Sequence, residues 1–133
     1  MEYKTGFKWL SRARKIDWCI QDKIVYIESL YTCCGLQGIS YDKISVITSP
    51  ENKFERIMGE IDREKREVER LRQLKEELIY EISEKINVLE PSPEKTVLMK
   101  FFIGCKDMKK IAIEMKYQEN YCYELRRKGI KKL

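Results

Sequence analysis

The side chains that are most informative about function lie near the C-terminus, where positive charges and hydrogen-bonding groups could bind an anionic partner. Residues 95–133 hold eleven Lys or Arg against four acidic residues, a net charge of +7 in a chain that carries +5 overall. Cationic side chains can neutralise phosphates, which supplies sequence-independent affinity for nucleic acid that falls with salt. The candidates for this role are Lys106, Lys109, Lys110, Arg126, Arg127, Lys128, Lys131 and Lys132. A solvated basic tail without a ligand is the alternative interpretation, but these residues follow a helical pattern.

That pattern predicts two short helices separated by a tight break. Residues 107–115 place four apolar side chains on one face: Met108, Ile111, Ala112 and Met115. Residues 118–133 have an inner face of Cys122, Leu125, Gly129, Ile130 and Leu133, and leave outside Asn120, Tyr121, Tyr123, Glu124, Arg127 and Lys128. Two helices joined so closely form a helix-turn-helix, whose second helix can enter the major groove of DNA.

Features of catalytic and metal sites are absent from the sequence. The chain has no His, no Gly-rich phosphate loop, no Ser in a nucleophile setting and no isolated carboxylate pair, so we expect no catalytic residues. Its five cysteines lack paired metal-ligand spacing, so we expect neither a metal site, a cofactor nor a disulfide framework. Cys19 and Cys122 are expected to be small buried residues, and redox sensing at Cys33 and Cys34 is the less favoured alternative.

The first ninety residues are expected to form two long helices that position this motif. Residues 7–34 carry a stripe with spacings of three and four: Leu10, Ala13, Ile16, Ile20, Ile24, Ile27 and Tyr31. Residues 35–50 break the pattern and are interpreted as a loop. A second helix is predicted from Pro50 to Leu89, because Ser49 and Pro50 have the layout of an N-cap and a first helical residue.

The second long helix resembles a coiled-coil seam interrupted by charges. One heptad column contains Phe54, Ile61, Val68, Lys75, Ile82 and Leu89, and the other contains Ile57, Glu64, Leu71, Leu78 and Lys85. Charged residues within these columns argue against an extended parallel dimer, so we predict an antiparallel hairpin within one chain. A homo-oligomer formed through the uncovered part of the hairpin remains open.

Residues 90–94 form the predicted boundary, because Pro91 and Pro93 disfavour helical backbone immediately before them. Pro93 then opens a lead helix that ends at Gly104 and Cys105, and Asp107 is a plausible N-cap for the next helix. The lead helix carries Val97, Leu98, Phe101 and Phe102. We therefore predict an all-α protein with a long, coiled-coil-like antiparallel helical hairpin over residues 1–90 and a three-helix helix-turn-helix module over residues 91–133.

The segment from Leu89 to Leu133 resembles the fourth conserved region of bacterial sigma factors. It is most similar to small phage-encoded regulators of the ArpU type, which attach such a region to a helical N-terminal part. Lys116 and Gln118 stand where these motifs usually have a Gly in the turn and a Ser or Thr as N-cap. The residues that carry the resemblance are Val97, Leu98, Phe101, Phe102, Ile111, Ala112, Met115, Tyr117, Cys122, Tyr123, Leu125, Gly129, Ile130, Lys131, Lys132 and Leu133.

The resemblance implies a regulator of phage transcription, of late genes in particular, that binds double-stranded DNA or contacts the host RNA polymerase. It places six residues at groove-facing positions of the recognition helix: Gln118, Glu119, Asn120, Tyr121, Tyr123 and Glu124. Asn120 suits an adenine edge, and either acid, Glu119 or Glu124, can accept from cytosine. Arg127, Lys128, Lys109 and Lys110 suit phosphates.

Two other functions remain open. The module can instead bind RNA polymerase or another protein with little affinity for DNA, which the acids on the last helix favour. A DNA-packaging adaptor with an oligomerising coil is a further alternative. No apolar run is long enough to span a bilayer, and the N-terminus lacks the order of a signal peptide, so we expect a cytoplasmic protein without a membrane partner.

Overall fold

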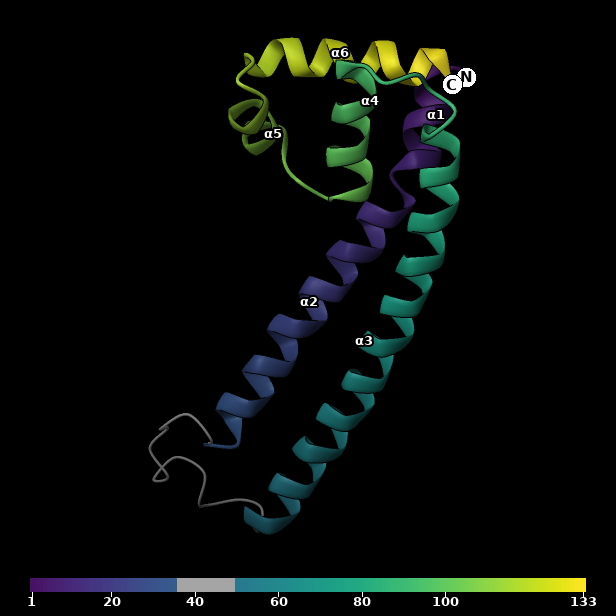
Figure 1. Ribbon diagram of the computed structural model, residues 1–133. Helices are drawn as coiled ribbons and strands as arrows, with labels where there is room; N and C mark the ends of the chain where they lie inside the picture. Colours follow the sequence, from purple (N-terminus) through teal and green to yellow (C-terminus); the bar gives the residue numbers. More distant parts are fainter. Residues whose placement is uncertain (36–49) are drawn as a thin grey trace. The chain divides into compact units, whose positions relative to one another are not determined.

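The computed structural model describes residues 1–35 and 50–133, and the described chain contains helices and no strands (Figure 1). The helices are α1 (Tyr3–Leu10), α2 (Arg12–Cys33), α3 (Pro50–Ile86), α4 (Pro93–Leu98), the π-helical η2 (Met99–Ile103), α5 (Met108–Met115) and α6 (Glu119–Lys132). The all-α prediction is therefore confirmed. Most of the predicted 35–50 loop lies outside the described residues.

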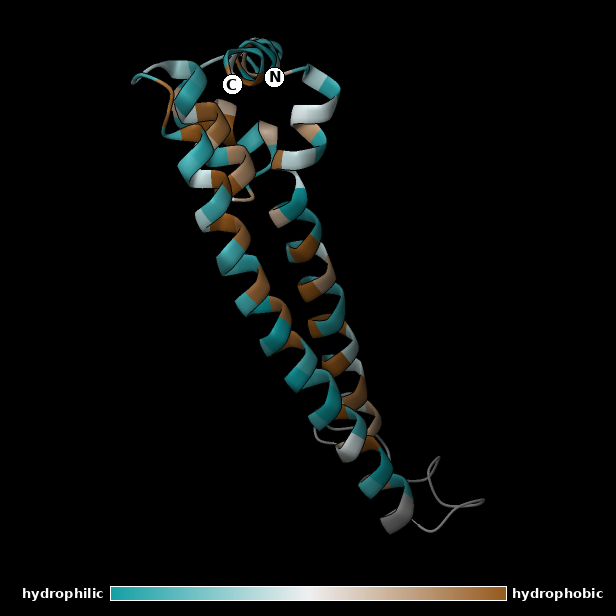
Figure 2. Cartoon of the chain, turned by 90° about the vertical axis from the view of Figure 1, so that its right-hand side faces the viewer, coloured by the Kyte–Doolittle hydropathy of each residue, from teal (hydrophilic) through white to brown (hydrophobic). Residues whose placement is uncertain are grey.

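The long helices α2 and α3 run antiparallel, as the heptad pattern predicted (Figure 1). Apolar residues gather along the sides of the two helices that face each other (Figure 2). Ile20 and Ile27 are buried on α2, and Ile61, Val68 and Leu71 are buried on α3. Burial of this apolar stripe is what stabilises so highly charged a pair of helices, because intrinsic helix propensity alone contributes little.

Two charged residues that interrupt the seam have partners on the opposite helix. The Lys75 ammonium lies 2.8 Å from the Asp17 carboxylate. The Glu64 carboxylate lies 2.8 Å from the Lys23 ammonium. A charge within an apolar seam is tolerated when it is paired and hydrogen-bonded. Each of these charges in the apolar seam therefore meets an opposite charge on the facing helix, which favours this pairing of α2 with α3.

The described residues form two compact units that divide within the long helices. One unit joins Met1–Asp17 to Leu74–Leu133, and the other is Trp18–Gln73. The boundary predicted from Pro91 and Pro93 lies inside the first unit, although the chain does leave helical backbone there. The first unit holds the helix-turn-helix segment.

The core of the first unit combines both ends of the sequence. Leu10 and Ala13 from the N-terminal helices share a buried cluster with Ile82 and Ile86 from α3. The same cluster includes the predicted lead-helix residues Val97, Leu98, Phe101 and Phe102, and residues of α5 and α6. The helix-turn-helix segment therefore rests on more than the three helices expected from residues 91–133.

The N-terminal helix differs from the prediction of one helix over residues 7–34. α1 begins at Tyr3, and Ser11 separates it from α2. Ser11 keeps right-handed backbone, and its N–H still donates to the Phe7 carbonyl, so the interruption is local. The Arg12 Nε donates to the Trp9 carbonyl at 2.9 Å and satisfies an acceptor beside the break. The second long helix ends at Ile86, three residues before the predicted Leu89.

Two predicted core positions are wrong. Cys19 is exposed, because it lies beside the buried Ile20 and therefore off the stripe that faces α3. Phe54 is 46% exposed, so burial of its heptad column begins with Ile61. Within residues 1–35 and 50–133, no helix combines the length and the apolar content that crossing a membrane requires.

Candidate nucleic-acid interface

The turn between α5 and α6 is built around a left-handed residue. Lys116 has φ 59° and ψ 37°, the conformation usually given to glycine in such turns. The Tyr117 N–H donates to the Ala112 carbonyl at 3.0 Å, and the Lys116 N–H donates to the Ile113 carbonyl at 3.3 Å. These are the two bonds of a Schellman ending, which satisfy the last carbonyls of α5. The predicted tight turn at Lys116 is therefore confirmed with a non-glycine residue.

The beginnings of the two helices are stabilised differently. The Asp107 carboxylate accepts from the Lys110 backbone N–H at 2.8 Å, which confirms the predicted N-cap of α5. Gln118 occupies the N-cap position of α6 in extended backbone, and its side chain makes no capping bond. The first turn of α6 thus leaves backbone N–H groups without a side-chain acceptor, and Gln118 itself is exposed.

Inner faces of both helices are buried as the spacing predicted. Met108, Ile111 and Ala112 are buried on α5. Cys122, Leu125, Gly129 and Ile130 are buried on α6. Burial raises the pKa of the Cys122 thiol, consistent with a neutral core residue.

Gly129 lets α6 approach α4 closely. A Cβ at this position would lie 2.8 Å from Leu98 Cδ1 and 3.4 Å from Glu94 Cβ. Figure 1 shows α6 crossing the end of α4. The close crossing buries one side of α6 and directs the opposite side to solvent.

The opposite side of α6 carries most of the predicted DNA-contacting residues. Asn120, Glu124, Arg127 and Lys131 recur at intervals of three and four, so they share one face, and all four are exposed. Tyr121 and Lys128 border this face and are exposed too. We call these six residues the outer face of α6. Its composition combines an amide, an acid, an aromatic ring and three cations.

The remaining predicted residues lie around this face. Glu119 is half-buried, whereas Tyr123 is exposed on the edge of α6 next to α1. Lys109 and Lys110 are exposed in the first turn of α5. The structure therefore groups the α6 residues on adjacent faces of one helix and places the two lysines on the preceding helix.

A pair of aromatic rings stands at the start of α6. The ring centroids of Tyr117 and Tyr121 are 5.0 Å apart with an interplanar angle of 60°. Tyr117 is 39% exposed and Tyr121 is 40% exposed. Edge-to-face contact favours a fixed arrangement of the two rings. Tyr117 belongs to the turn, so outward helical spacing alone did not place it in the candidate site.

Arg126, one of the predicted phosphate contacts, packs against aromatic rings. Its guanidinium lies 4.8 Å from the ring centroids of Phe7 and Phe101 and 4.9 Å from that of Tyr123. A cation is attracted to the face of an aromatic ring. Tyr123, which was predicted to lie on the outside of α6, contacts the same guanidinium that joins α6 to Phe7 of α1. The interaction joins residues 119 positions apart in sequence, which no local pattern reveals.

Two further cations of the predicted phosphate set are paired with carboxylates. The ammonium groups of Lys106 and Lys100 lie 2.7 and 2.8 Å from the Glu114 carboxylate. Hydrogen bonds from Lys100 and Lys106 lower the pKa of Glu114 to about 2. Lys132 lies 3.8 Å from Glu94. Arg127, Lys128 and Lys131 are exposed on α6, and the Arg127 guanidinium lies 5.4 Å from the centroid of the Tyr3 ring.

Arg14 fixes the connection between η2 and α5. Its Nη1 donates to the Phe101 carbonyl at 2.9 Å and to the Lys106 carbonyl at 3.0 Å. Its guanidinium also lies 3.9 Å from the centroid of the Phe101 ring. Cys105 adopts a left-handed φ of 53° within this connection. A residue near the N-terminus thus helps position the first helix of the motif, a role that the sequence analysis missed.

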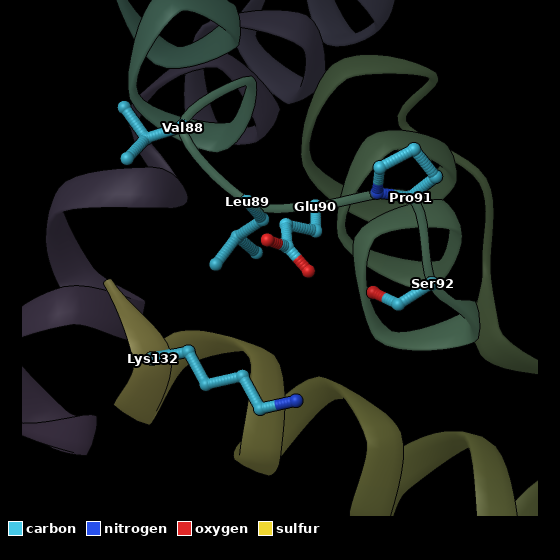
Figure 3. A pocket seen from close by; sticks show the side chains of 6 residues that line it. All are labelled: Val88, Leu89, Glu90, Pro91, Ser92 and Lys132. Atoms are coloured by element: carbon cyan, nitrogen blue, oxygen red, sulfur yellow. The ribbon is translucent and has the colours of Figure 1, made fainter.

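A pocket of about 350 Å³ lies where the chain passes from α3 to α4. It is lined by Val88, Leu89, Glu90, Pro91, Ser92 and Lys132 (Figure 3). The Ser92 hydroxyl accepts from the Lys95 N–H and caps α4. Figure 3 shows Lys132 reaching below the Glu90 carboxylate. The carboxylate that pairs with Lys132 is that of Glu94, at 3.8 Å. Among the described residues no cluster suited to a metal ion occurs.

Neither a protein-family model, nor a curated protein, nor a solved structure matches this chain.

Proposed function

We propose that the helix-turn-helix segment binds duplex DNA and that the protein is a phage-type transcriptional regulator. The observation that carries this proposal is the outer face of α6, the helix that follows the turn at the left-handed Lys116. Asn120, Arg127, Lys128 and Lys131 are exposed on this face. A helix presented in this way fits the major groove of B-DNA.

Some of the exposed groups suit the edges of the bases, and others suit the phosphates. The Asn120 amide can donate to and accept from adenine in the major groove, and Gln118, two residues earlier, has the same chemistry. Arg127 and Lys128 suit phosphates, as do Lys109 and Lys110 on α5. Glu124 lies among cations on the outer face and suits the amino group of cytosine. Phosphate contacts then provide affinity, and the first turns of α6 provide specificity.

A protein-binding function is favoured by a different observation. Ile113 is 78% exposed on α5, and three tyrosines are exposed in or near the turn. Exposed apolar side chains of this kind are common in protein interfaces. The same module can therefore contact RNA polymerase, either together with DNA or as a factor with little affinity for DNA.

The first test measures the salt dependence of DNA binding. Duplexes selected from a randomised pool by the full chain are titrated at several salt concentrations, with excess nonspecific DNA. We expect the Arg127→Ala, Lys128→Ala variant to bind all duplexes more weakly. The slope of log affinity against log salt should decrease in magnitude by about 1.8 if two phosphate contacts are lost.

A matched variant, Arg66→Ala with Arg72→Ala, removes the same charge from exposed positions on α3. It should retain the wild-type slope, which separates a local contact from an effect of net charge. Absence of selection by the wild-type chain at any salt would reject DNA binding and favour the protein-binding function. A binding assay with purified RNA polymerase would then be the next measurement.

A further inference from the structure

The aromatic pair at the start of α6 lies where a recognition helix approaches the bases. Tyr117 is in the turn, and Tyr121 is in the first turn of α6, beside Asn120. Both rings stay about 40% exposed although they contact each other. An exposed aromatic pair at the start of a helix that carries cations further along suits a polyanionic partner that also presents an apolar group.

Duplex DNA presents such a group in the major groove. The C5-methyl group of thymine is the apolar feature that distinguishes the edge of an A·T pair there. Asn120, next to Tyr121 in sequence, has the amide that suits the adenine of the same or a neighbouring pair. Lys128 and Lys131 lie further along α6, on or beside the same face, and Lys109 and Lys110 lie on α5. These cations are complementary to the backbone of DNA, while the acids Glu119 and Glu124 are closer to Tyr121 in sequence.

We infer that Tyr117 and Tyr121 form an apolar platform that contacts thymine methyl groups, so that the protein selects sites containing A·T pairs. This inference depends on the proposed function, because it specifies what the first turn of α6 recognises. The edge-to-face contact holds the rings in place before binding, which reduces the entropy lost when they meet the DNA. Apolar contact without hydrogen bonding selects the methyl group and tolerates changes elsewhere on the base.

Replacing thymine by uracil tests this inference, since uracil keeps the Watson–Crick pair and lacks the methyl group. A duplex selected by the full chain is synthesised with single replacements at every thymine. For the wild type, we expect about a fourfold weaker affinity for each methyl group that the platform covers. Replacements at other positions should leave the affinity unchanged.

Two variants connect the effect to the rings. Tyr121→Ala should bind the thymine duplex more weakly and bind thymine and uracil duplexes equally. Tyr121→Phe keeps the ring and should retain the preference for thymine. Tyr80→Ala removes another exposed tyrosine, on α3, and should behave as the wild type. Circular dichroism of each variant establishes that the helices are retained.

The outcomes separate this inference from the proposal on which it depends. If the wild type selects no duplex, the proposed function fails. If it selects a duplex but binds thymine and uracil forms equally, DNA binding stands and the methyl-group inference is rejected. If Tyr121→Ala keeps the thymine preference of the wild type, the platform is likewise rejected and the rings are assigned to a protein partner.

Discussion

At the scale of single residues, Glu114 shows how a charge can fix the geometry of a motif without contacting its ligand. Its carboxylate accepts hydrogen bonds from Lys100 on η2 and Lys106 in the following connection. Both lysines come from the segment preceding α5, while Glu114 belongs to the last turn of α5. The three residues therefore hold the beginning of the motif against its first helix.

This arrangement predicts a loss of stability in acid. The pKa of Glu114 is lowered to about 2 in the folded chain, so its contribution is fully present above the ordinary value of 4.5. It declines as the pH falls toward 2, because protonation abolishes both ion pairs. Glu114→Gln should be less stable than the wild type at pH 7 and should show a shallower decline between pH 4.5 and 2. Thermal unfolding at several pH values checks this, with Glu77→Gln, an exposed change on α3, as the control.

At the scale of elements, two glycines in helices are expected to respond oppositely to the same substitution. Replacing Gly129 by Ala places a Cβ 2.8 Å from Leu98 Cδ1, whereas a Cβ at Gly59 meets nothing within 4 Å. Overpacking costs about 1–3 kcal/mol, and replacing a helical glycine gains about 0.5–1 kcal/mol. Gly129→Ala should therefore lower the free energy of unfolding by roughly 1 kcal/mol, and Gly59→Ala should raise it by about 0.5–1 kcal/mol.

Urea unfolding of both variants measures these changes. An increase in stability for Gly129→Ala would show that α4 and α6 can separate without cost, contrary to the close crossing in the structure. The Gly129→Ala variant should also bind DNA more weakly under the proposed function, because the orientation of α6 depends on this crossing.

Most element boundaries could be predicted from the sequence because their causes are local. Asp107 caps α5 by accepting from the N–H of Lys110, three residues later, and the left-handed Lys116 ends the helix. The buried stripe of α6 follows from the spacing of its apolar residues alone. The break at Ser11 and the π-helical turn at residues 99–103 have no such local cause. The contacts of Arg14 with Phe101 and Lys106, and of Arg126 with Phe7, could not be predicted, because these partners lie 87 or more residues away in sequence. Base contacts by the outer face of α6 stay a prediction.

At the scale of the whole molecule, the N-terminal helix belongs to the same compact unit as the helix-turn-helix segment. Phe7 contacts Phe102 with ring centroids 5.7 Å apart, and Leu10 is fully buried in the shared core. A fragment of residues 91–133 would lack these contacts. The compact unit that holds the helix-turn-helix segment is thus larger than the segment that carries its sequence pattern.

Deletion of residues 2–10 should therefore unfold the first unit. Truncating a buried Leu costs about 2–5 kcal/mol on its own. The deletion removes the buried Leu10 together with the partly buried Phe7. We expect the deleted chain to lose the selected duplex although every predicted DNA-contacting residue is still present. Lys4→Ala with Lys8→Ala, two exposed changes on α1, should keep both stability and binding. Circular dichroism and the duplex titration together check this, and full binding by the deleted chain would contradict it.

The division of the first unit between the two ends of the sequence also orders the events of biosynthesis. Residues 18–73 are contiguous and can fold while the rest of the chain is still being synthesised. Residues 1–17 are synthesised before α4, η2 and α6, and Phe7 and Leu10 can be covered only once these later helices are present. Until then the apolar side of α1 stays exposed on the nascent chain, and we expect a chaperone to bind this side of the helix during that interval.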